Sequence, residues 1–105
     1  MTFFVDADSC PVRIREIICK TAKRLQVPAV FAANRPIPIP KNSYCTSVIT
    51  EAEDQAADIY ILDHAAQGDM VITRDIPLAK QLVEAHIKVI NDRGVVYTAE
   101  NIDER

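Results

Sequence analysis

The sequence predicts an α/β fold in three layers, with helices on both faces of a central, mainly parallel sheet. Short apolar runs rich in β-branched residues alternate along the chain with longer segments whose apolar residues recur at helical spacing. Strands that alternate with helices in this way form parallel sheets joined by right-handed crossovers. The chain has 105 residues, near the commonest size of a domain, so we expect a single domain over residues 1–105.

The first strand and the first helix are predicted within residues 3–25. Residues 3–5 are consecutive and apolar, which suits a buried strand. Pro11 suits the first turn of the helix that follows, and Pro28 lies just beyond its end. The helix is predicted over residues 11–25 from apolar residues at helical spacing, which are Ile14, Ile17, Ile18, Ala22 and Leu25.

The remaining elements follow from the same two periodicities. Residues 35–40 carry three prolines and predict a stiff extended connector, because proline cannot continue a helix. Gly68 lies just beyond the second helix. Strands are predicted over residues 29–33, 46–50, 70–73 and 87–90, and helices over residues 51–66 and 76–85.

Acids end two strands that we expect to be neighbours. In the expected strand order 3-2-1-4-5, connections leave the first and fourth strands in opposite directions, and ligands bind at such a switch point. Asp6 and Asp8 end the first strand, and Thr73 and Asp75 end the fourth. Two distant parts of the chain therefore direct acids to one crevice. Capping of the first helix by Asp8 or Ser9 is the alternative, but it does not explain both parts.

The second predicted helix adds further acids. Asp54 and Asp58 lie one turn apart on the same face and could join the crevice, whereas an exposed acidic helix face is the alternative. Converging carboxylates without a histidine partner are ligands that suit Mg²⁺ or Mn²⁺. Such an ion relieves the repulsion between the acids, activates a water and stabilises a leaving oxyanion. The acids therefore predict a hydrolytic nuclease centre.

Charge is unevenly distributed along the sequence. The net charge is −3, yet residues 1–41 carry seven Lys and Arg against three acids, whereas residues 42–105 carry five against twelve. A basic half beside an acidic half suits phosphate binding next to a carboxylate site, and a solvated helix face is the alternative. The candidate nucleic-acid contacts on the first predicted helix are Arg13, Arg15, Lys20 and Lys23.

The sequence predicts a soluble, cytoplasmic protein with no membrane partner. No apolar run approaches the ~18 residues of a membrane-spanning helix, and the start at Met1 lacks the features of a signal peptide. Three cysteines without a C-x-x-C pattern, beside two histidines, suggest neither a disulfide framework nor a zinc site. The oligomeric state stays open, a homo-oligomer included.

Four segments of the sequence carry motifs of a known protein family. They are Val5-Asp6-Ala7-Asp8-Ser9-Cys10-Pro11, Ala56-Ala57-Asp58 with Ile61, Gly68-Asp69-Met70-Val71-Ile72-Thr73-Arg74-Asp75 with Leu78-Ala79, and Arg93-Gly94. Together, and in this order, they resemble the YaiI/YqxD family of uncharacterised bacterial proteins over nearly the whole chain. That family is similar in turn to PIN-like domains, whose compact α/β fold gathers acids around Mg²⁺ or Mn²⁺ in ribonucleases.

The resemblance implies a PIN-like domain that hydrolyses RNA with Mg²⁺ or Mn²⁺. Relatives often carry a further acid where this chain has Gln55, so the second helix is expected to supply one ligand fewer unless Asp54 compensates. Relatives also continue beyond the equivalent of residues 101–105, so the chain is expected to lack their C-terminal helical extension. The implied catalytic and metal-binding residues are Asp6, Asp8, Asp58 and Asp75, with Ser9 and Thr73 as supporting hydroxyls.

Three other functional classes share some of these features. A phosphatase of the haloacid dehalogenase type also has D-x-D after its first strand, but Lys80 and Asp92 match its remaining groups poorly. A receiver domain needs an aspartate at the end of its third strand, where Thr50 stands here. A non-catalytic RNA-binding or regulatory module on the same fold is the main alternative to the nuclease, because Gln55 reduces the acidic set.

Overall fold

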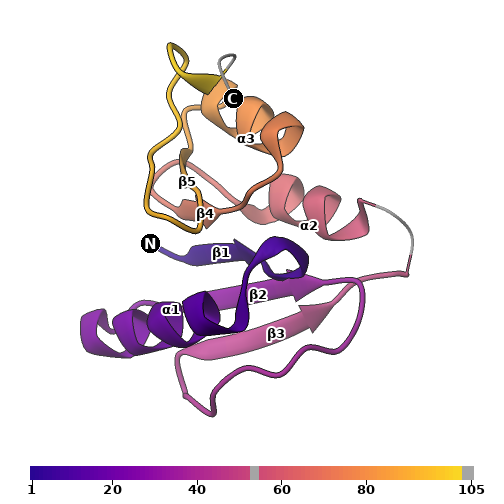
Figure 1. Cartoon of the computed structure of the whole chain (residues 1–105), viewed down its shortest axis with the longest axis vertical. Coiled ribbons are helices and arrows are strands. Elements are labelled where there is room, and N and C mark those ends of the chain that lie inside the picture. Colours follow the sequence, from indigo (N-terminus) through magenta and orange to yellow (C-terminus); the bar gives the residue numbers. More distant parts are fainter. Residues whose placement is uncertain (53–54, 103–105) are drawn as a thin grey trace.

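The computed structural model describes residues 1–52 and 55–102. In this part of the chain, five parallel strands form one sheet with helices on both faces, as Figure 1 shows. The order β3-β2-β1-β4-β5 confirms the predicted fold class and strand order. The strands are β1 (Phe3–Asp6), β2 (Ala29–Ala33), β3 (Cys45–Ile49), β4 (Met70–Ile72) and β5 (Lys88–Ile90).

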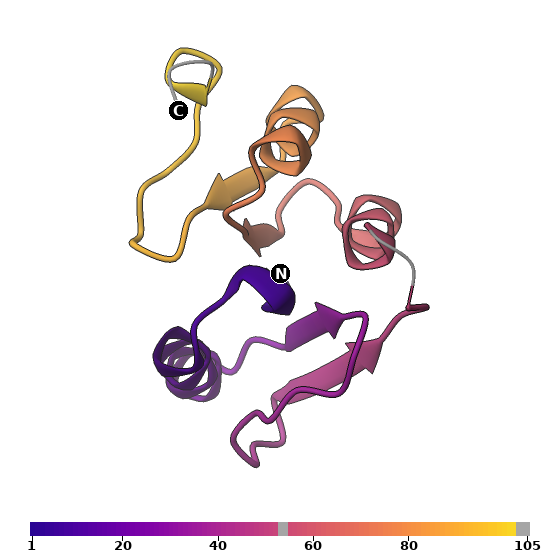
Figure 2. The same cartoon turned by 45° about the vertical axis from the view of Figure 1, so that its right-hand side comes forward.

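The helices divide between the two faces of the sheet. α1 packs on one face, and α2 and α3 pack on the other, so that Figure 2 shows α1 apart from the other two. None of these described helices combines the length and the apolar character that crossing a bilayer requires. The helical elements are the 3-10 turn η1 (Ala7–Ser9), α1 (Val12–Leu25), α2 (Ala56–His64) and α3 (Ile76–Glu84).

Alternating side chains of β1 contribute to two hydrophobic cores. Phe4 belongs to the core under α2 and α3, together with Ile61 and Leu78. Phe3 and Val5 belong to the core under α1. Because successive strand residues point to opposite faces, a strand in a sheet covered on both sides is apolar at every position. This explains the continuous apolar run from which β1 was predicted.

The boundaries of several elements differ from the predicted ones by a few residues. The largest difference is in α2, which begins at Ala56 and not at residue 51. Gln55, just before it, has a φ of 68°, so the chain turns through the left-handed region before the helix starts. β4 ends at Ile72, which leaves Thr73 just beyond the sheet.

The buried face of α1 also differs from the predicted apolar stripe. Ile17 and Leu25 are 51% and 53% exposed, whereas Arg15 and Cys19 are buried. The physical reason is tertiary, because the segment over residues 36–42 packs beside the helix and contributes isoleucines to the same core. This segment encloses the side of α1 that carries Arg15 and Cys19.

Replacement of Ile61 by alanine should lower the free energy of unfolding by about 2–5 kcal/mol, because this fully buried side chain would leave a cavity under α2. Ile59 lies on the same helix and is 56% exposed, so Ile59→Ala should change that free energy by less than about 0.5 kcal/mol. Urea unfolding curves measure both. Equal effects of the two variants would contradict the packing of α2 described here.

Candidate functional site

A cleft of about 360 Å³ lies beyond the carboxyl ends of β1 and β4, and we call it the acidic cleft. All four predicted acids border it, and they come from three separate segments of the chain. The predicted Ser9 borders it as well. The residues that line the acidic cleft are Asp6, Asp8, Ser9, Asn34, Gln55, Ala57, Asp58, Arg74 and Asp75.

Asp6 is the most deeply buried acid of the cleft, with 5% of its surface exposed. Its Oδ2 atom accepts hydrogen bonds from Thr73 Oγ1 at 2.8 Å and from Ser9 Oγ at 3.1 Å. Burial raises the pKa of Asp6, these two hydrogen bonds oppose the rise, and the charges of Asp8 and Asp75 add to it. Asp6 is thus held firmly at a place where negative charge is unfavourable.

Thr73 connects Asp6 to the acid that follows β4. Its hydroxyl donates to Asp6 and also accepts a hydrogen bond from the backbone N–H of Asp75 at 3.0 Å. Asp75 in turn caps α3, because its Oδ1 atom accepts from the backbone N–H of Leu78 at 2.9 Å. A single hydroxyl group therefore sets the relative positions of two acids.

Asp58 reaches the cleft from the first turn of α2 and is half-buried. Its pKa is raised to about 7. Burial is the largest cause, followed by the charges of Asp6 and Asp75, a hydrogen bond with the Asp75 side chain, and the charge of Asp8. Asp58 therefore holds its proton to higher pH than an ordinary aspartate, because the cleft does not accommodate four negative charges well.

The alternative interpretation of Asp8 and Ser9 as caps of the first helix is wrong. No side chain accepts a hydrogen bond at the start of α1. Ser9 donates to Asp6 instead. Asp8 points toward the end of β2, where its Oδ2 atom accepts from the backbone N–H of Asn34 at 3.2 Å and its Oδ1 atom lies 3.5 Å from Arg35 Nε.

Arg74 is a residue of the cleft that the sequence reasoning missed. Its side chain is exposed, its backbone N–H donates to Ser9 Oγ at 3.4 Å, and its guanidinium donates to Asp92 Oδ2 at 2.6 Å. This hydrogen bond lowers the pKa of Asp92. The sequence does contain a signal for this residue, because Arg74 stands between Thr73 and Asp75, which are both predicted site residues.

The acids do not form a metal-coordinating group as they stand. Within residues 1–52 and 55–102, no three His, Cys, Asp or Glu side chains meet the spacing of a metal site. Asp6 is engaged by two hydroxyls, Asp75 caps α3, and Asp8 contacts the loop after β2. The carboxylates must turn toward one another before they can share an ion.

The remaining predicted residues are Asp54 and four basic residues of α1. Asp54 lies outside the described residues. On α1, the side chains of Arg13, Lys20 and Lys23 are exposed. Arg15 is buried, and its guanidinium donates to backbone carbonyl groups. The basic residues of α1 therefore differ in their surroundings, although the sequence presents them as one group.

Comparison with known proteins identifies relatives along the whole chain. The model of a family described as "Uncharacterized BCR, YaiI/YqxD family" matches residues 4–105, and the chain belongs to this family, as the motifs predicted. It is similar to UPF0178 proteins of Treponema denticola (55% identity over 103 residues), Treponema pallidum (56% over 105) and Syntrophobacter fumaroxidans (50% over 105).

These relatives are longer than the chain. The matches cover 98%, 100% and 100% of this chain but 65%, 59% and 69% of the relatives from T. denticola, T. pallidum and S. fumaroxidans, respectively. The chain therefore spans less than two thirds of the length of the first two. No solved structure matches it.

The raised pKa of Asp58 predicts a pH dependence of stability. Because the folded state holds this proton up to about pH 7 and an ordinary aspartate loses it near 3.8, the free energy of unfolding should fall as pH rises between these values. Screening by solvent at this half-buried position limits the effect to about 1–2 kcal/mol. In EDTA, Asp58→Asn should flatten the decrease in melting temperature between pH 5 and pH 8. The exposed Asp63 on the same helix is the control, and a profile unchanged in Asp58→Asn would refute the assignment.

Proposed function

We propose that this member of the YaiI/YqxD family is a divalent-metal-dependent nuclease that hydrolyses phosphodiester bonds of single-stranded RNA in the acidic cleft. The observation that supports this most is the convergence of four carboxylates from three segments of the chain on one cleft. The cleft lies at the switch point of a parallel sheet, where ligands bind in folds of this kind. The resemblance to PIN-like ribonucleases agrees with this proposal.

The donor groups of the cleft suit Mg²⁺ or Mn²⁺, because both ions bind carboxylate oxygens. Asp6, Asp58 and Asp75 would hold the ion, with Asp8 at the edge of the cleft. The raised pKa values of Asp6 and Asp58 support this assignment, since burial and the neighbouring carboxylates cause them and a bound divalent cation would relieve both. When bound, the ion supplies an activated water and stabilises the leaving oxyanion.

The chain's own residues orient the acids and the substrate. Thr73 and Ser9 hold Asp6 through its Oδ2 atom, and the start of α3 holds Asp75. These hydrogen bonds give Asp6 and Asp75 defined positions, from which their carboxylates would turn toward a bound ion. Arg74 lies exposed at the rim of the cleft, where its guanidinium can exchange Asp92 for a phosphate oxygen of the substrate.

A non-catalytic RNA-binding or regulatory module is the second candidate function. It is favoured by the acids of the described residues, which do not form a ready metal-coordinating group. It is also favoured by Gln55, which lines the cleft as a neutral residue. On this alternative, RNA would bind without being cleaved, so metal-dependent cleavage separates the two functions.

Mn²⁺ should raise the melting temperature of the wild-type chain, because an ion that binds only the folded state stabilises it by mass action, by about 2.7 kcal/mol at a concentration of 100 times Kd. Asp6→Asn should lose most of this shift, since it removes a charged oxygen from the proposed ligand set. Asp63→Asn, in an exposed residue of α2, should keep it. A wild-type melting temperature that does not respond to millimolar Mn²⁺ would reject the metal site.

Cleavage of single-stranded RNA should require Mg²⁺ or Mn²⁺ and stop with EDTA. Asp6→Asn or Asp75→Asn keeps the shape of the side chain but removes its charge, so the rate should fall by about 10²-fold or more, which corresponds to about 3 kcal/mol of transition-state stabilisation. Glu100→Gln, at an exposed position, should keep the wild-type rate. An Asp6→Asn variant as active as wild type would trace the cleavage to a contaminating nuclease.

A further inference from the structure

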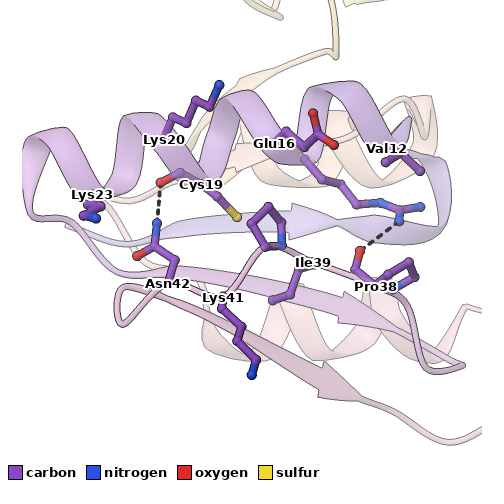
Figure 3. A pocket seen from close by; sticks show the side chains of 11 residues that line it. Val12, Glu16, Cys19, Lys20, Lys23, Pro38, Ile39, Lys41 and Asn42 are labelled. Atoms are coloured by element: carbon purple, nitrogen blue, oxygen red, sulfur yellow. Dashed lines mark hydrogen bonds between the residues drawn. The ribbon is translucent and has the colours of Figure 1, made fainter.

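A groove of about 560 Å³ lies beside α1 and is larger than the acidic cleft. One wall is α1 between Val12 and Lys23, and the other is residues 38–42, as Figure 3 shows. At about 1.5 Å of rise per residue, the helical wall is about 16 Å long. The residues that line this basic groove are Val12, Arg15, Glu16, Cys19, Lys20, Lys23, Pro38, Ile39, Pro40, Lys41 and Asn42.

The groove carries positive charge from both walls. Lys20 and Lys23 come from the helix and Lys41 from the facing segment, and Figure 3 shows Lys20 and Lys41 on opposite sides of the groove. Within residues 1–52 and 55–102, none of these three lysines forms an ion pair. Glu16 is the acid in the lining. The surplus of charge favours an anionic ligand that extends along the groove, since the lysines are spread along it.

Hydrogen bonds hold the two walls together at both ends. Near the start of α1, the Arg15 guanidinium donates from Nε to the carbonyl oxygen of Cys10 at 3.0 Å and from Nη1 to that of Pro38 at 3.3 Å. Further along, Asn42 Nδ2 donates to the carbonyl oxygen of Cys19 at 2.8 Å. Prolines stiffen the segment between these contacts. The groove is therefore formed before a ligand arrives, which reduces the entropic cost of binding.

The basic groove and the acidic cleft lie next to each other along the chain. The loop after β2 contributes Asn34 to the acidic cleft and Pro38 to the basic groove. The segment after β1 contributes Ser9 to the cleft and Val12 to the groove. Ser9 and Val12 are three residues apart, at most roughly 11 Å along the backbone, so an extended polymer in one site can reach the other, whereas a small phosphate compound would use only one.

We propose that the basic groove binds the phosphate backbone of single-stranded RNA and directs the strand to the acidic cleft. Lys20, Lys23 and Lys41 contact the phosphates, and the apolar surface of Ile39 with its flanking prolines accepts sugars and bases. Arg15 belongs to the wall and does not contact the strand. Only the events in the cleft rest on the proposed nuclease function, because strand binding in the groove needs neither a metal ion nor cleavage.

The test measures binding of a fluorescent 12-nucleotide RNA by anisotropy in EDTA at several KCl concentrations. The variant Lys20→Gln/Lys23→Gln/Lys41→Gln should bind at least about tenfold more weakly at 50 mM KCl. Its slope of log K against log salt should be flatter by about 2, since each contact on a single strand contributes about 0.7. The control Arg24→Gln/Lys80→Gln/Lys88→Gln removes the same charge from exposed positions outside the groove. It should stay within about threefold of wild type.

Three results would overturn the proposal. The first is an equal loss of RNA affinity in the two triple variants, and the second is no RNA binding by the wild type. The third is that uridine monophosphate displaces the labelled RNA at the same molar concentration as unlabelled RNA does. A failure of the nuclease proposal gives a different result. If the chain binds RNA through the groove but cleaves nothing with either metal, the binding proposal stands and only the nuclease proposal fails.

Discussion

The hydrogen bond from Thr73 to Asp6 is the contact on which the acidic cleft depends. It is 2.8 Å long, it is buried, and it joins residues 67 positions apart at the ends of β1 and β4. Because the same hydroxyl accepts the backbone N–H of Asp75, it fixes two acids at once. A buried carboxylate without such donors bears the full cost of its lost hydration. The pairing of β1 with β4 therefore also determines where Asp6 and Asp75 lie.

The acidic cleft and the basic groove have opposite electrostatic character. Burial and mutual repulsion raise the pKa values of Asp6 and Asp58, so the cleft is a region where the fold retains an unfavourable charge distribution. The lysines beside α1 have no partner of opposite charge within the described ranges. The cleft carries negative charge and the groove carries positive charge that other side chains of the described residues do not balance. A divalent cation in the cleft and a phosphate polymer in the groove would balance both.

Strand order and the convergence of the four acids could be predicted from the sequence, because both follow from local patterns combined with the rules of parallel sheets. The environment of α1 could not. Periodicity predicts that Ile17 is buried and Arg15 exposed, because the first is apolar and the second charged. Their actual exposure depends on the segment that packs against the helix, where Pro38 lies 23 residues beyond Arg15 and accepts its hydrogen bond. The late start of α2 depends on the left-handed turn at Gln55, for which the residue type gives no warning. Arg74 could have been predicted, because it stands between Thr73 and Asp75 and the predicted strand order already places the fourth and fifth strands side by side.

The sheet order also has a consequence for biosynthesis. The central strand β1 leaves the ribosome first, but its neighbour β4 begins only at Met70, after β2, β3 and α2. A nascent chain that ends before β4 can pair β1 with β2 alone, and of the two hydroxyls that bind Asp6 it contains Ser9 but lacks Thr73. Residues 1–69 therefore wait with one edge of β1 open and with Asp6 lacking its Thr73 donor while the rest is translated, at about 5–20 residues per second. Chaperones that shield exposed strand edges would meet this chain in that interval.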